Sequence, residues 1–127
     1  MNTVTTKQAR IDMARARAGE IVLPQVTHIA FGTGGHEPGD VTKPIPPSEN
    51  DTALEQEVIR VPIASRTRIN ETTVRYKVSL AGDQANGMPL TEAGLIDSNG
   101  RLVARKTFGA KVKEPDVSMD FEWDEEF

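Results

Sequence analysis

Alternation of apolar and polar residues constrains this fold more than any other feature of the chain. Residues 73–80 (TVRYKVSL) and residues 117–123 (VSMDFEW) carry an apolar side chain at every second position. Successive side chains of a β-strand point to opposite faces, so both segments predict half-buried strands. The alternation also places Tyr76 and Trp123 on the buried faces, and we expect both to pack in the core rather than stack on a ligand.

Further strand and turn signals extend this pattern. Apolar residues alternate again over 59–63, and an Asp-Ser-Asn-Gly turn at 97–100 separates two apolar runs, which indicates a hairpin. Strands joined by turns rather than by helices favour antiparallel pairing. We therefore predict a mainly β (α+β) single domain over residues 1–127, built as an antiparallel sheet or a sandwich-like arrangement with antiparallel strands over 57–124.

One helix is expected near the N-terminus, over residues 5–18. Thr5 and Gln8 have the spacing of a capping box, helix-favouring Ala and Arg residues follow, and Gly19 suits the C-terminal end. The apolar face of this segment is thin. We therefore expect the helix to be stable only when it packs against the rest of the domain.

Residues 32–50 contain four glycines and four prolines and predict a long protruding surface loop. The loop does not match a phosphate-binding loop, because its first lysine, Lys43, precedes a proline, and a dinucleotide fingerprint would need glycine in place of Glu37. His28, His36, Glu37 and Asp40 contain no closely spaced ligand pair that would fix a metal ion. We expect no cofactor and no metal site.

Other chemistries are also disfavoured. The chain has no cysteine, which excludes a disulfide framework, a thiolate metal site and a thiol nucleophile. Its serines lack a nucleophile-elbow context, and its alternating C-terminal carboxylates are expected to face water. We therefore predict that the protein is not an enzyme and has no catalytic residues. A net charge of −4 argues against nucleic-acid binding, and neither a signal peptide nor a membrane span is recognisable.

Charge is divided into two adjacent blocks near the C-terminus. Residues 101–113 carry five positive side chains and no negative one, whereas residues 114–127 carry seven negative and no positive ones. Blocks of opposite sign suggest pairing within the chain or between copies of it. Together with the protruding loop they supply the candidate interface residues, which are His36, Asp40, Lys111, Lys113, Asp120 and Glu122.

Four segments occur in an order that resembles a known family. They are the N-terminal helix ending at Gly19, VTHIAFGTGG at 26–35, TALEQEVIRVPI at 52–63, and MPLTEAGLIDSNGRLVARKTF at 88–108. Together they resemble the N-terminal domain of phage tail-collar fibre proteins. The residues of the last segment that carry the likeness are Glu92, Gly94, Leu95, Asp97, Gly100 and Leu102.

The resemblance implies a structural virion component, a tail-fibre or baseplate protein of a phage or prophage that acts through protein–protein assembly. Its expected partners are other tail and baseplate proteins and copies of itself, as a homotrimer or a ring. Its expected location is the virion tail, after assembly in the host cytoplasm. Because larger members continue into a fibre shaft and this chain ends at Phe127, an adaptor, a short tail or baseplate protein, or a fragment fits better than a complete fibre.

Two alternatives remain open at this stage. One is a small carbohydrate-binding or hydrolytic domain that uses the loop around His36 and Asp40. The other is an assembly chaperone or regulator encoded beside tail genes.

Overall fold

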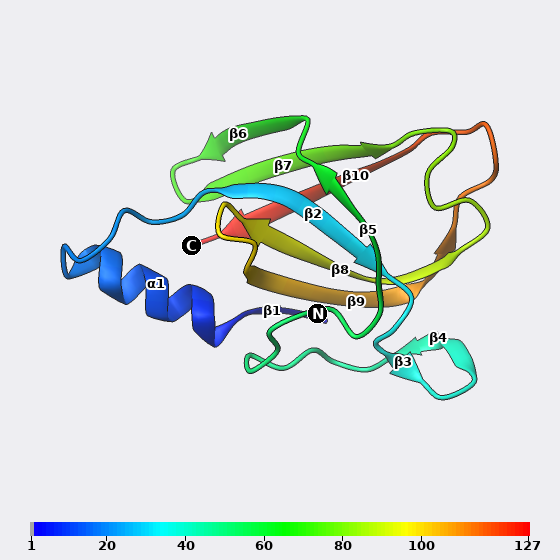
Figure 1. Ribbon diagram of the computed structural model, residues 1–127, viewed down its shortest axis with the longest axis horizontal. Coiled ribbons are helices and arrows are strands. Elements are labelled where there is room, and N and C mark those ends of the chain that lie inside the picture. Colours follow the sequence, from blue (N-terminus) through cyan, green and yellow to red (C-terminus); the bar gives the residue numbers. More distant parts are fainter. Residues whose placement is uncertain (1) are drawn as a thin grey trace.

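Two antiparallel sheets form the body of the protein over residues 2–127, the part of the chain that this computed structural model describes (Figure 1). Met1 lies outside the described residues. The elements, in chain order, are β1 (Thr3–Thr5), α1 (Lys7–Arg17), β2 (Val26–Gly32), β3 (His36–Glu37), β4 (Asp40–Pro44), β5 (Glu57–Pro62), β6 (Ser65–Asn70), β7 (Thr73–Leu80), β8 (Pro89–Asp97), β9 (Leu102–Val112) and β10 (Met119–Glu126).

The strand order shows how the sheets are built. The larger sheet has the order β1-β9-β8-β2-β5, the second has the order β10-β7-β6, and β3 and β4 form a separate hairpin. Neighbouring strands within each sheet are antiparallel. The predicted fold class, mainly β with one N-terminal helix and antiparallel strands, is therefore confirmed.

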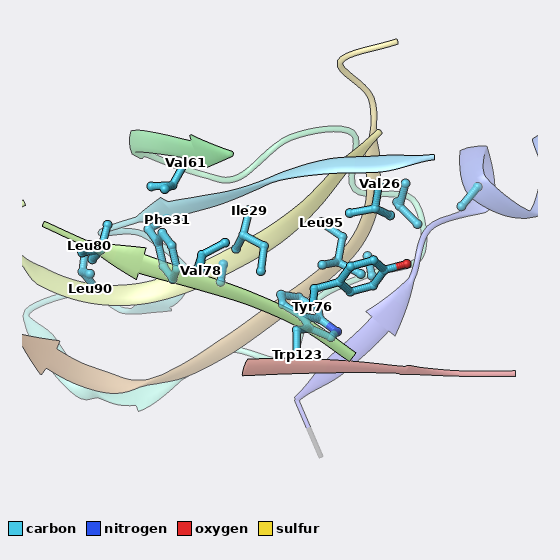
Figure 2. Packing of buried hydrophobic residues seen from close by; sticks show 14 residues of the cluster. Val26, Ile29, Phe31, Val61, Tyr76, Val78, Leu80, Leu90, Leu95 and Trp123 are labelled. Carbon is cyan, nitrogen blue, oxygen red and sulfur yellow. The ribbon is translucent and has the colours of Figure 1, made fainter. Parts of the chain in front are cut away.

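The core lies between the two larger sheets. Figure 2 shows side chains of β2, including Ile29 and Phe31, meeting Val78 of β7. The rings of Phe31 and Phe121 lie 4.5 Å apart between centroids, which links β2 to β10. Tyr76 and Trp123 are only 5% and 4% exposed, as the alternation predicted. Large apolar and aromatic side chains from both sheets thus stabilise one shared core.

The β8–β9 hairpin confirms the turn predicted at 97–100. Gly100 has a φ of 76°, a conformation that favours glycine, and its N–H donates to the Asp97 carbonyl over 2.9 Å. The Asp97 carboxylate accepts hydrogen bonds from the backbone N–H groups of Asn99 and Arg101, over 2.8 and 3.1 Å. The Asp and Gly residues at 97 and 100 therefore have direct roles in closing the hairpin at the centre of the larger sheet.

The predicted capping box at Thr5 and Gln8 is wrong. The helix begins at Lys7 after Thr6, whose hydroxyl accepts a hydrogen bond from the Ala9 N–H over 3.2 Å, while the Gln8 amide donates to Asp12. Residues Thr3–Thr5, partly assigned to the helix from sequence, form strand β1 instead. The Thr6 hydroxyl also donates to the Leu102 carbonyl over 2.7 Å, so attachment to β9 fixes where the helix starts.

The expected loop at 32–50 is more ordered than its composition predicted. It contains the β3–β4 hairpin, which lies at one end of the molecule beside β9 (Figure 1). The Thr107 hydroxyl of β9 donates to the Ile45 carbonyl over 2.8 Å, and the Thr91 hydroxyl of β8 donates to the Gly34 carbonyl over 2.6 Å. Both ends of the loop are therefore attached to the larger sheet.

Candidate functional site

Glu92, in the middle of β8, is a fully buried carboxylate beneath this loop. It accepts hydrogen bonds from three backbone N–H groups, that of Gly34 over 2.9 Å and those of Glu55 and Gln56 over 2.8 Å each. A buried carboxylate destabilises a fold unless it is paired and hydrogen-bonded. Here the bonds join the Gly-rich turn after β2 to the segment that leads into β5.

Arg105 of β9 supplies the compensating positive charge. Its Nη2 and Nε lie 2.9 and 3.2 Å from Glu92 Oε1, and its Nη1 lies 2.8 Å from Asp51 Oδ2. Burial opposes the charged form of Arg105, but the hydrogen bonds to Asp51 and Glu92 outweigh burial and raise the pKa of the guanidinium above its ordinary value. We refer to Glu92, Arg105 and Asp51 as the Glu92 cluster.

Gly32 and Gly34 of the turn lie so close to the backbone and side chains around this cluster that neither position has room for a side chain. A Cβ atom on Gly32 would lie 2.5 Å from the Gln56 carbonyl oxygen, and one on Gly34 would lie 2.6 Å from the Glu55 Cβ. Both distances are shorter than side chains allow. The glycine cluster therefore lets two backbone segments meet around a protein carboxylate rather than around a phosphate.

Sequence reasoning did not find the Glu92 cluster as a unit. The family resemblance includes Glu92 but assigns it no partner, and the sequence places Arg105 only within a basic block. One local signal was present, because Glu92 stands inside LTEAGL, a run of small and apolar residues. A carboxylate in a strand buried on both faces needs a cationic or N–H partner, but the sequence does not show that the partners come from residues 34, 51, 55, 56 and 105.

His36 and Asp40 lie in the β3–β4 hairpin and are bound to groups of that hairpin and its base. The ring nitrogens of His36 lie 2.8 Å from the Glu37 carbonyl oxygen and 3.0 Å from that of Thr33. The Thr42 hydroxyl and backbone N–H both donate to Asp40 and lower the pKa of its carboxyl. Within residues 2–127, no three His, Asp or Glu side chains gather closely enough to hold a metal ion.

The expectation that Lys113 contacts a neighbouring subunit is wrong. Its side chain is fully buried, and its Nζ donates to the Gly82, Glu114 and Val117 carbonyls over 3.2, 3.2 and 2.9 Å. It also donates to the amide oxygen of Asn86. Carbonyl groups of two neighbouring turns converge there and solvate the ammonium group in place of water. Lys111, in contrast, is exposed.

Within the chain, the two charged blocks contact other segments more than each other, whereas pairing between copies stays a prediction. Asp120 and Glu122 are exposed on β10, where Glu122 lies 3.4 Å from Lys77 of β7 and Asp124 lies 2.8 Å from Arg75. In the basic block, Arg101 pairs with Asp12, and Lys106 lies 4.4 Å above the Trp123 ring centre. Burial lowers the pKa of Lys106. Lys111 is exposed, and its Nζ lies 5.9 Å from the ring centre of Phe108.

Two hollows border β10. One is a groove of about 470 Å³ between β1 and β10, lined by Thr3, Thr5, Ala104, Lys106, Trp123 and the acidic residues 122 and 124–126. The other is a smaller apolar pocket of about 180 Å³ between α1 and the second sheet. Tyr76 donates to Glu125 over 2.7 Å at the wall of this pocket, and burial raises the pKa of both side chains.

No protein-family model matches the sequence, and a search of curated proteins likewise finds no match. The helix of the described residues, α1, lacks the length and apolar character of a membrane span.

Proposed function

We propose that the protein is a structural component of a phage or prophage tail, at the fibre or the baseplate, and that it acts through protein–protein assembly. The observation that carries the proposal is the Glu92 cluster. Glu92 is the acidic residue of the segment that resembles tail-collar fibre proteins, and its carboxylate holds two loops in fixed positions on the larger sheet. Loops held in this way are suited to presenting a constant surface to a neighbouring particle protein.

The chemistry of the cluster supports assembly rather than catalysis. Five N–H donors, from three backbone groups and Arg105, surround the Glu92 carboxylate, which is inaccessible to solvent. A carboxylate that reacts with a substrate needs an open approach to the reacting atom. Gly94 supports the same interpretation, because its Cβ would lie 2.5 Å from Leu102 Cδ1, so its role is close packing within the hairpin.

The carbohydrate-binding or hydrolytic alternative draws less support. His36 and Asp40 already hydrogen-bond to Thr33, Glu37 and Thr42, so a sugar would have to compete with these contacts. A glycan array tests this alternative directly. Binding that is lost on His36→Ala or Asp40→Ala would favour it over the tail proposal.

Particle composition tests the tail proposal. Phage-like particles would be induced from a strain that encodes the chain, purified on a density gradient, and examined by mass spectrometry and by immunogold electron microscopy. We expect the chain to co-purify with tail proteins in constant ratio and the gold label to lie at the tail end. Intact tails that lack the chain would overturn the proposal.

A further inference from the structure

We propose that copies of the chain associate head to tail, by antiparallel addition of strand β6 of one copy to the free edge of β10 of the next. The inference rests on the proposed function in taking assembly as the role of the chain, and it identifies a second copy as the partner. Its basis is a pair of complementary edges on the smaller sheet, on opposite sides of β7 (Figure 1).

The first edge is that of β10. This eight-residue strand ends the order β10-β7-β6, and it has β7 as its strand neighbour among the described residues. In an antiparallel pair, alternate residues direct their N–H and C=O groups away from the partner, so β10 presents unpaired backbone groups along its outer edge. The groove between β1 and β10 runs along this edge, with Lys106 and Trp123 among its lining residues.

The second edge is that of β6, residues Ser65–Asn70. All six residues are exposed, and the strand carries Arg66 and Arg68 but no acidic residue. Arg66 uses one N–H group to bind the Val26 carbonyl, which leaves four donors of its guanidinium without a hydrogen-bond partner in the described part of the chain. Arg68 has no hydrogen bond or ion pair from its side chain to any residue in 2–127.

The faces of the two strands match when the second copy is turned over. The pairings of Thr67 and Asp124 with Arg75 place Arg66 and Arg68 on the core side of the sheet and Glu122 and Asp124 of β10 on its outer side. Within one copy, β6 and β10 both run antiparallel to β7 and therefore parallel to each other. For β6 of one copy to pair antiparallel with β10 of another, one copy must therefore be turned over. This brings both arginines of the turned copy to the outer side of its neighbour's sheet.

The spacing of the side chains then fixes a register. Arg66 opposite Asp124 places Arg68 opposite Glu122, because both pairs are separated by two residues. In the same register Ile69, which is 41% exposed and lies at the irregular step of the β6–β7 pairing between Arg68 and Asn70, stands opposite the half-buried Phe121. One arrangement thus brings together two pairs of opposite charge and one apolar pair, each of which stabilises cross-strand pairing.

Symmetric pairing of identical edges is disfavoured by the same charges. Two β10 edges would bring carboxylates together, and two β6 edges would bring guanidinium groups together, which destabilises either contact. The favoured contact is therefore heterologous. It leaves one free edge of each kind on a dimer, so association can continue beyond two copies.

Complementary charge reversal tests the contact. We expect wild-type mass, measured by light scattering over a dilution series, to rise above the 13.9 kDa of one chain. Arg66→Glu with Arg68→Glu, and separately Glu122→Lys with Asp124→Lys, should each weaken association about tenfold or more, since each creates an edge-to-edge repulsion. Mixing the two variants should restore association, because the acidic β6 edge of the first variant can then pair with the basic β10 edge of the second. Lys111→Glu, outside both edges, is the control and should associate as the wild type does.

A second pair of variants avoids the intrachain ion pairs of Glu122 and Asp124. Ile69→Asp should weaken association, whereas Ile11→Asp, at a similarly exposed isoleucine of α1, should not; thermal melting would confirm that both fold. A wild type that stays monomeric, or charge and Ile69 variants that associate normally, would overturn the inference. A monomeric chain that is nevertheless found in purified tails would overturn the inference about self-association and leave the proposed function intact. A chain that self-associates but is absent from tails would support the inference and overturn the proposed function.

Discussion

Glu92 illustrates how one side chain can determine the position of several segments. Glu92→Gln keeps the size of the side chain but removes the charge that faces Arg105 and the N–H groups of Gly34, Glu55 and Gln56. Breaking a buried charge pair typically lowers the free energy of unfolding by about 3–5 kcal/mol, and we expect a loss near the lower end of that range. Urea denaturation would measure it.

Glu49→Gln is the matched control, because Glu49 forms an ion pair with Arg10 at a site where both side chains are about half exposed. Such a surface pair contributes about 0–1 kcal/mol. Equal losses for the two variants would contradict the structural role assigned to Glu92.

Glu125 gives the protein a pH-dependent contribution to stability. Burial raises the pKa of Glu125 above its ordinary value of 4.5, so the folded state binds the proton more tightly than the unfolded state. The stability from this group is complete below the unfolded pKa and is lost as the pH rises through the folded one. Glu125→Gln keeps an oxygen that can accept from Tyr76 and should stabilise the protein more at pH 7 than at pH 4.

Urea midpoints of wild type and Glu125→Gln, measured from about pH 4 to pH 8, would test this sign. Glu126→Gln, at the exposed neighbouring position, is the control and should show no comparable trend. Parallel pH profiles for wild type and Glu125→Gln would disprove the assigned role of Glu125.

At the scale of elements, the ammonium group of Lys113 joins two turns, within residues 81–88 and 113–118. Lys113→Met removes this donor and leaves the carbonyls of Glu114 and Val117 without their ammonium partner, whereas the Gly82 carbonyl still accepts from the Asp116 N–H and the Asn86 amide. A lost buried partner costs about 1–3 kcal/mol. We expect a lower melting temperature and faster proteolysis within 81–88 and 113–118. Lys111→Met is the matched control, and identical proteolysis of the two variants would contradict this interpretation.

The helix start offers a direct comparison of sequence and structure. Thr6→Ala removes both the N-cap bond to Ala9 and the bond to the Leu102 carbonyl. Loss of an N-cap costs about 0.5–2 kcal/mol in the free energy of unfolding. Thr5→Ala, at the position that the sequence favoured as the cap, should cost less, and chemical denaturation would rank the two. A larger loss at Thr5 would favour the original capping box.

Strands with a strong local signal could be predicted and those without one could not. The alternation of β7 and β10 and the turn at 97–100 depend on neighbouring residues, so the sequence alone indicated them correctly. Strand β1 has only three residues, too few to show a period, and it exists because β9 pairs with it. The Glu92 cluster was missed for a similar reason, since its members join only after the sheet has formed.

At the scale of the whole molecule, the distribution of charge matters more than the net charge of −4. The acidic side chains of β10 outnumber the Arg75 and Lys77 partners on β7, while β6 on the opposite edge is basic. Charge pairs between exposed edges are screened by salt. If the edges associate as proposed, an increase in NaCl from about 0.05 to 0.5 M should lower the mean mass by light scattering. A mass that rises with salt would indicate an apolar contact instead.

The β3–β4 hairpin is fixed at its base but free at its tip. An added Cβ at Gly35 would lie 2.8 Å from Arg105 Nη2, whereas at Gly39 it would meet nothing within 4 Å. The hairpin should therefore tolerate an insertion at Gly39 but not at Gly35, four residues earlier. Gly39 is consequently a suitable point to insert a short peptide tag, which would report the location and orientation of the protein while leaving the Glu92 cluster undisturbed.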